Sequence, residues 1–105
     1  MLIKERYMML NLVKLTEIKE YSQHWRSQEK HYALREVLIN PAFVVMVVED
    51  PDFKERLIDF DLWPDGLHQK SIFTKVYLSN GSQNSSHHIY VIGNLEVVGT
   101  KLSVN

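Results

Sequence analysis

The stretch that decides the fold runs from Ile72 to Ile92 and reads I-F-T-K-V-Y-L-S-N-G-S-Q-N-S-S-H-H-I-Y-V-I. Alternating side chains from Ile72 to Leu78 predict a strand, and His87 to Ile92 predicts the strand that returns beside it. The dipeptide Asn80-Gly81 is a strong signal for a tight hairpin turn. A tight turn there would pair the first apolar strand with the polar residues S-Q-N-S-S. A longer connection, from Ser79 to Ser86, aligns the two apolar runs, so we expect the longer one.

Further strands are predicted before this hairpin. Leu34 to Ile39 reads as a strand that ends at Asn40-Pro41, and Ala42 to Val48 is an apolar run rich in β-branched residues. Leu10 to Ile18 predicts another strand, in which a phase slip indicates either a bulge or burial on both faces. The polar residues 19–33 carry scattered aromatic side chains. They fit a short helix, an extended hairpin or a long loop equally well.

Two short helices complete the pattern. Glu49-Asp50-Pro51-Asp52 has the chemistry of a helix start, and an apolar stripe (Phe53, Leu57, Ile58 and Phe60) predicts a helix over Asp52 to Phe60. Gly93-Asn94 offers a break and an N-cap before a second helix up to Leu102. The sequence therefore predicts an α+β fold with about five mostly antiparallel strands and one or two short helices.

Length and composition favour one ordinary globular domain. The chain has 105 residues, of which 45% are hydrophobic and 24% charged. We expect a single domain over residues 1–105, with residues 1–8 as a flexible N-terminal extension. The chain has no cysteine, which excludes disulfides and thiolate chemistry and fits a cytoplasmic protein. No apolar run approaches the roughly 20 residues of a membrane span.

The charge balance argues against polyanionic partners. Twelve basic and 13 acidic residues give a net charge of −1, so nothing draws the chain to nucleic acid or to an anionic membrane. A small RNA- or DNA-binding barrel is therefore the least favoured of the functions considered.

Catalytic and metal-binding patterns are lacking in the sequence. His87 and His88 are adjacent on a predicted strand, so their side chains point to opposite faces, and no H-E-x-x-H spacing exists. The carboxylates near residues 49–65 are placed as helix-start and turn residues are. No G-x-S-x-G elbow, P-loop or G-x-G-x-x-G motif is present. We expect a protein that is no enzyme and has neither metal nor cofactor.

The residues best suited to binding lie on one strand and in the long loop. Arg35 interrupts an apolar strand, either as half of a cross-strand ion pair or as a grip for phosphate or carboxylate. The loop offers hydroxyl, amide and backbone N–H donors without carboxylates, which suits an anion, although a solvated turn has the same composition. Phe73 or Tyr90 would stack on a base. The predicted ligand-binding residues are Arg35, Phe73, Asn80, Ser82, Asn84 and Tyr90.

The strand from Ala42 to Val48 also predicts an oligomer. A strand that is apolar on both faces must be covered on both faces. One or two short helices cover one face of a five-stranded sheet, so we expect a second subunit to cover the rest.

Three stretches carry a resemblance to known families: R-E-V-L-I-N-P-x-x-V-V from Arg35, F-T-K-V-Y-L-S-N-G from Phe73, and I-Y-V-I-G from Ile89. They resemble the small β-rich flagellar and swarming regulators of the FlbD family, in a longer version with an insertion from Glu49 to Lys70. They also resemble the small phage proteins that sequester nucleotide immune signals, the anti-Thoeris sponges.

Two functions are therefore expected. The first is a homo-oligomeric, non-enzymatic protein that captures an anionic, nucleotide-like signalling molecule, as a phage anti-defence sponge does in the host cytoplasm. The alternative is a protein-binding regulator, either FlbD-like or a phage inhibitor of a host protein, whose strand edge or apolar face docks its partner.

Overall fold

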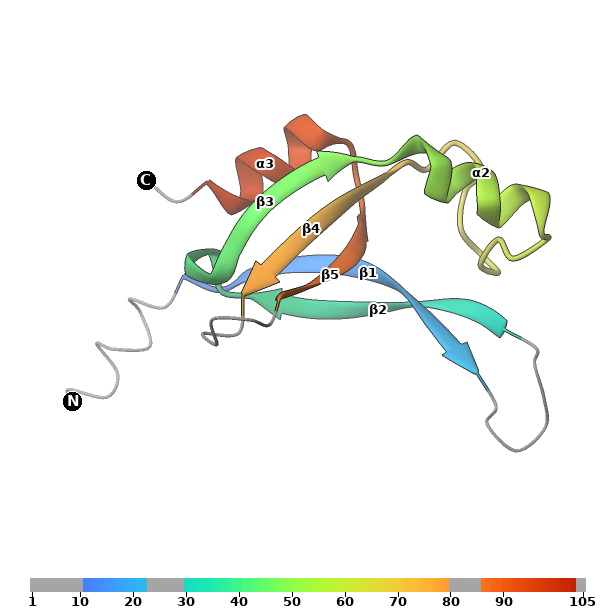
Figure 1. Ribbon diagram of the computed structural model, residues 1–105, viewed down its shortest axis with the longest axis horizontal. Coiled ribbons are helices and arrows are strands. Elements are labelled where there is room, and N and C mark those ends of the chain that lie inside the picture. Colours follow the sequence, from blue (N-terminus) through green and yellow to red (C-terminus); the bar gives the residue numbers. More distant parts are fainter. Residues whose placement is uncertain (1–10, 23–29, 80–85, 104–105) are drawn as a thin grey trace.

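The computed structural model describes residues 11–22, 30–79 and 86–103, which form one five-stranded antiparallel sheet with two α-helices (Figure 1). The strands lie in the order β2-β1-β5-β4-β3. The α+β class and the five strands are as predicted. The elements are β1 (Val13–Ser22), β2 (Lys30–Ile39), the 3-10 helix η1 (Pro41–Phe43), β3 (Val44–Glu49), α2 (Pro51–Asp59), β4 (Phe73–Ser79), β5 (Ser86–Ile92) and α3 (Leu95–Leu102).

The hairpin of β4 and β5 has the register that the longer connection requires. Val76 pairs with Ile89, and the ladder closes at Ser79 opposite Ser86. A two-residue turn at Asn80-Gly81 would instead join Ser79 directly to Ser82. The alignment of the two apolar runs therefore decides the register, and the hairpin dipeptide does not.

The long hairpin of β1 and β2 settles the alternatives left open for residues 19–33, as far as these are described. The two strands pair continuously from Val13 opposite Ile39 to Ser22 opposite Lys30. Tyr21 therefore lies on a strand, where its ring stacks on His31 at 5.7 Å. The phase slip in β1 reflects burial on both faces, since the register of β1 with β2 shows no bulge.

Each face of the sheet has its own core cluster, because successive side chains on a strand point to opposite faces. On one face Leu15, Val76 and Val91 pack with Val98 and Leu102 of α3. On the other face Ile18 and Phe73 pack with Phe53 and Leu57 of α2. Each helix thus covers a different face of the same sheet.

Both helices begin at a side-chain cap; Asn94 was predicted as one, whereas α2 starts one residue before the predicted Asp52. The Asp50 carboxylate accepts a hydrogen bond from the N–H of Phe53 at 3.3 Å, and Pro51 occupies the first turn of α2. The Asn94 side chain accepts from the N–H of Val97 at 2.7 Å and starts α3. The predicted apolar stripe of α2 is only half correct, because Phe53 and Leu57 are buried while Ile58 and Phe60 are exposed.

The strand predicted over Ala42 to Val48 begins two residues later. The Asn40 side chain accepts from the N–H of Ala42 at 3.0 Å and caps the short helix η1, so β3 starts at Val44. The register of β3 with β4 shifts between Val44 and Met46, which leaves Val45 as a bulge. β3 is an edge strand, and neither α2 nor α3 covers the side chains of Val45 and Met46.

Candidate functional site: an apolar strand edge and an acidic groove

Arg35, the first predicted ligand-binding residue, is engaged within the sheet. Its Nε donates a hydrogen bond to Glu17 Oε1 at 2.8 Å, and the Glu17 side chain is buried. Glu17 pairs with Val91, the neighbour of Tyr90. Arg35 therefore lies on the opposite face of the sheet from Tyr90, and the two side chains do not share a site.

Phe73 and Tyr90 lie on the same face but have different surroundings. The ring of Phe73 is only 5% exposed and sits in the core beneath α2, so it is not available to stack on a base. Tyr90 is half-buried, its ring stacks on Phe53 at 3.7 Å, and its hydroxyl donates to Asp50 at 2.7 Å. The remaining predicted residues, Asn80, Ser82 and Asn84, lie outside the described residues.

Tyr90 is accompanied by three side chains that the sequence analysis did not select. The Lys75 ammonium lies 4.9 Å from the Tyr77 ring centroid and 5.9 Å from that of Tyr90. The His88 ring lies between them, at 5.8 Å from Tyr77 and 5.5 Å from Tyr90. We call Lys75, Tyr77, His88 and Tyr90 the aromatic platform. Lys75 and Tyr77, like His88 and Tyr90, are two positions apart on one strand and so point to the same face. This spacing is the sequence signal that groups them.

The electrostatics of this platform follow from its contacts. The hydrogen bond from Tyr90 lowers the pKa of Asp50, and burial together with that hydrogen bond raises the pKa of Tyr90. Burial, with a further contribution from Lys75, lowers the pKa of His88. At neutral pH the platform therefore holds a cation on Lys75 beside the neutral phenol of Tyr90 and the neutral imidazole of His88.

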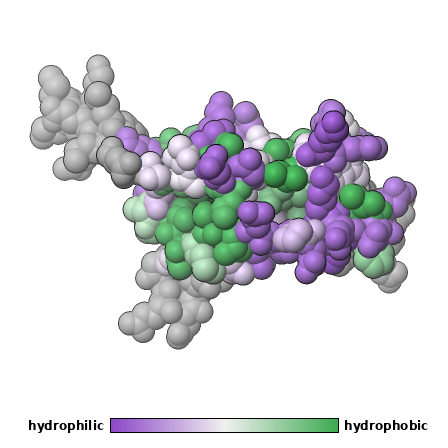
Figure 2. Space-filling model, turned by 90° about the horizontal axis from the view of Figure 1, so that it is seen from above, coloured by the Kyte–Doolittle hydropathy of each residue, from purple (hydrophilic) through white to green (hydrophobic). Residues whose placement is uncertain are grey.

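A group of exposed apolar side chains lies at the start of β3. The exposed fractions are 49% for Phe43, 64% for Val45 and 48% for Met46. Figure 2 shows a continuous hydrophobic area over this part of the molecule, whereas the surface over α2 is mainly hydrophilic with small hydrophobic spots. We call Phe43, Val45 and Met46 the β3 patch. None of the three carries a polar side chain.

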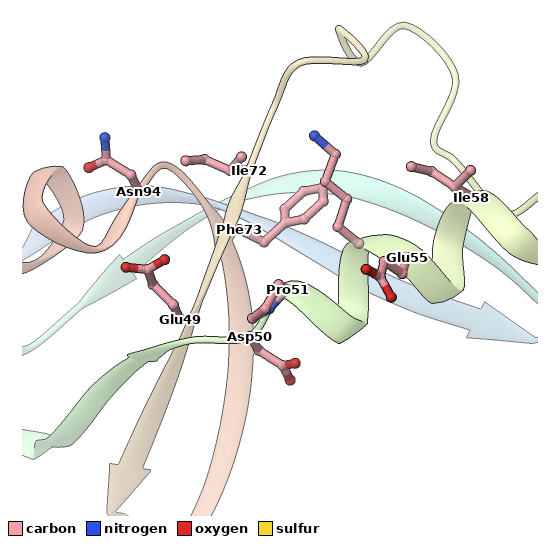
Figure 3. Close-up of a pocket in the computed structure, with 9 residues that line it drawn as sticks. Glu49, Asp50, Pro51, Glu55, Ile58, Ile72, Phe73 and Asn94 are labelled. Atoms are coloured by element: carbon pink, nitrogen blue, oxygen red, sulfur yellow. The ribbon is translucent and has the colours of Figure 1, made fainter.

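A groove opens where β3 ends and α2 begins (Figure 3). It has a volume of about 300 Å³ and combines a buried aromatic floor with apolar and acidic walls. Ile58 and Ile72 are 57% and 44% exposed at its margin. Its lining residues are Glu49, Asp50, Pro51, Lys54, Glu55, Ile58, Ile72, Phe73 and Asn94.

A second hollow continues along the same helix. It has a volume of about 450 Å³, shares Lys54 and Ile58 with the first, and extends to Trp63. The Trp63 Nε1 donates to the carbonyl of Leu67 at 2.9 Å, which fixes the indole, and the Lys54 ammonium lies 5.6 Å from its ring centroid. We call the two hollows together the α2 groove.

The charge of the chain is concentrated around this groove. Between Glu49 and Asp65 there are seven carboxylates and two basic residues, a net charge of −5, although the whole chain has a net charge of −1. The structure places Glu49, Asp50 and Glu55 at the first hollow and Asp61 at the second. From the sequence, the carboxylates of this segment are expected as helix-start and turn residues, not as part of a groove.

Neither a metal site nor a membrane helix is found in the described part of the chain. No three of its His, Asp or Glu side chains gather closely enough to hold a metal ion. None of its helices is long and apolar enough to cross a membrane.

No protein-family model, curated protein or solved structure matches this chain.

Proposed function

We propose that this chain is a small, non-enzymatic protein-binding module, which associates with a second copy of itself through the β3 patch and holds a segment of a partner protein in the α2 groove. The observation that carries the proposal is the exposure of Phe43, Val45 and Met46, which lie close together in the chain where η1 leads into the edge strand β3. Contiguous exposed apolar side chains of this kind are typical of interaction surfaces.

A second copy suits the β3 patch because the patch is uncharged. Two identical charged surfaces repel each other, whereas two identical apolar surfaces gain free energy by removing each other from water. The overall charge of −1 adds little long-range repulsion between copies. The contact covers the side of β3 that α2 and α3 leave open, which is the role expected of a second subunit.

The bulge at Val45 determines how two copies meet. A bulge interrupts the regular ladder of backbone groups at an edge and so works against continuous strand-to-strand pairing. The copies therefore meet mainly through the side chains of Phe43, Val45 and Met46.

Sedimentation velocity over a concentration series tests this proposal. We expect a monomer–dimer equilibrium for the wild type, and we expect Val45→Lys with Met46→Lys to weaken it by about tenfold or more, because two lysines would have to leave water. Phe60→Lys is the matched control, since Phe60 is 69% exposed but lines neither surface. A wild type that stays monomeric at all concentrations would refute the self-association.

A nucleotide-like anion at the aromatic platform is the second candidate function. It is favoured by Lys75, whose ammonium lies within 6 Å of two tyrosine rings beside His88, a combination that suits a phosphate and a stacked base. The carboxylates of the α2 groove disfavour an anion there, so the platform is the better place for it. This candidate fits the resemblance to signal-sequestering sponges, and the first fits the FlbD-type regulators.

Calorimetric titration with AMP distinguishes the two. If the platform binds nucleotides, Lys75→Met abolishes the heat of binding, while Arg35→Ala leaves it unchanged because Arg35 is on the other face of the sheet. Absence of heat with the wild type would remove this second candidate.

A further inference from the structure

We infer that the α2 groove takes a cationic, amphipathic segment of a partner protein, one that places apolar side chains on the groove floor and lysine or arginine at its acidic margin. This inference rests on the proposed protein-binding function and adds the chemical class of the partner. It follows from three features of the groove: its apolar surface, its unpaired carboxylates and its extent.

The apolar surface supplies the attraction that is independent of charge. Ile58 belongs to α2 and Ile72 directly precedes β4, and Figure 3 shows them on the same side of the groove, with Phe73 nearby. Both isoleucines are about half exposed. Apolar side chains of a bound segment would cover them, which removes apolar surface of both molecules from water.

The carboxylates at the margin of the groove indicate the sign of the partner's charge. Figure 3 shows Glu49 and Glu55 on either side of Pro51, and neither makes an ion pair with a described residue. Asp50 is already engaged, by the hydroxyl of Tyr90 and by the first turn of α2. Glu49 and Glu55 are therefore the groups that remain for a cationic partner.

The one basic residue of the groove does not cancel this charge. The Lys54 ammonium lies over the Trp63 ring at 5.6 Å, at the junction of the two hollows and beside the indole. Cationic side chains of a bound segment would meet Glu49 and Glu55 at separate points of the margin. An acidic partner would be repelled by the same pair.

The extent of the groove favours a chain segment over a small cation. The two hollows, of about 300 and 450 Å³, follow α2 from its first residue to the Trp63 loop. A segment that lies along α2 can insert several successive side chains. A small cation without apolar groups would leave Ile58 and Ile72 uncovered.

Fluorescence anisotropy with three labelled peptides tests the inference: a leucine–lysine peptide, the same pattern with glutamate for each lysine, and tetralysine. We expect the leucine–lysine peptide to bind, with an affinity that falls as salt is added, and we expect the other two to bind much more weakly. Glu49→Gln with Glu55→Gln should weaken binding about three- to tenfold, in line with two exposed ion pairs. Ile58→Ser should also weaken it.

Asp59→Asn is the matched control, because Asp59 belongs to the same acidic segment but lines neither hollow; we expect its affinity to equal that of the wild type. Circular dichroism checks that each variant is folded. Equal binding of the lysine and glutamate peptides, with Ile58→Ser still weakening both, would overturn the charge selection while leaving protein binding in place. If no peptide bound, or if the two glutamine substitutions had no more effect than Asp59→Asn, the groove would not be a site for cationic segments. The self-association at β3 is measured separately and is unaffected by these outcomes.

Discussion

The β3 patch and the α2 groove follow each other in the chain, yet they expose apolar side chains in opposite electrostatic settings. No charged residue lies in the chain from Phe43, through Val45 and Met46, until Glu49. Ile58 and Ile72 lie among carboxylates. The difference shows in Figure 2 as one continuous hydrophobic area against scattered hydrophobic spots.

This difference indicates two kinds of partner. An uncharged apolar surface can meet an identical copy of itself, and an apolar surface rimmed by carboxylates requires a complementary partner. The two surfaces also depend on different supports. β3 is held by its ladder with β4, while α2 is held mainly by the buried side chains of Phe53 and Leu57. Substitutions that remove one of these supports should therefore affect the two surfaces differently.

Leu57→Ala is expected to have the largest effect on stability. Leu57 is 1% exposed and anchors α2 on the sheet, so its truncation should lower the free energy of unfolding by about 2–5 kcal/mol. Urea denaturation measures this, with the exposed Ile58→Ala as a control expected to change it by less than about 0.5 kcal/mol. The α2 groove should be lost before self-association is. If the two substitutions lowered the free energy of unfolding equally, Leu57 would not be the residue that anchors α2 on the sheet.

Arg35→Ala tests a contact that lies outside both surfaces. Its removal leaves the buried Glu17 carboxylate without its hydrogen-bond partner, so we expect the free energy of unfolding to fall. Neither self-association nor peptide binding should change. A weaker peptide affinity with unchanged stability would instead indicate that Arg35 acts in binding.

Tyr90→Phe is expected to have a smaller effect on the free energy of unfolding, which arises at the start of α2. It removes the hydroxyl that donates to Asp50 at the start of α2, at a cost of about 1 kcal/mol or less, since Asp50 is largely solvated. The pKa of Asp50 is lowered by this bond, so the stabilisation is present above the usual carboxyl pKa of 3.8 and is lost as the pH falls through the lower folded-state value.

Urea midpoints from pH 7 down to pH 3 measure the effect of Tyr90→Phe. The difference between wild type and variant should be constant at neutral pH and shrink as Asp50 is protonated. A difference that grows on acidification would contradict the assigned bond.

The sequence predicts the fold well where local pattern and pairing agree. The apolar runs on either side of the long loop align only in one way, and the structure has that register, Val76 opposite Ile89. Asn94 is recognisable as a cap because a side-chain oxygen at that position satisfies the free N–H groups of the first turn, and Glu49 to Asp52 is recognisable as a helix start.

The surfaces are less accessible to prediction because they are assembled from distant residues. The engagement of Arg35 depends on the register that places it opposite Glu17, 18 positions earlier. Ile58 and Ile72 line the same hollow of the α2 groove, and no local pattern links the two. One signal was present: Phe53 and Leu57 are four residues apart on one helix face, and Ile58 falls off that face. An exposed isoleucine beside the carboxylates follows from this spacing.

Native mass spectrometry of the full chain with the leucine–lysine peptide tests the central claim, that the β3 patch takes a second copy while the α2 groove takes a different partner. We expect the wild type at twice the chain mass of 12.4 kDa with peptide bound, and the variant Val45→Lys with Met46→Lys at the single mass, still carrying peptide. A wild type found only at the single mass, or a variant that loses the peptide together with the second copy, would contradict the claim.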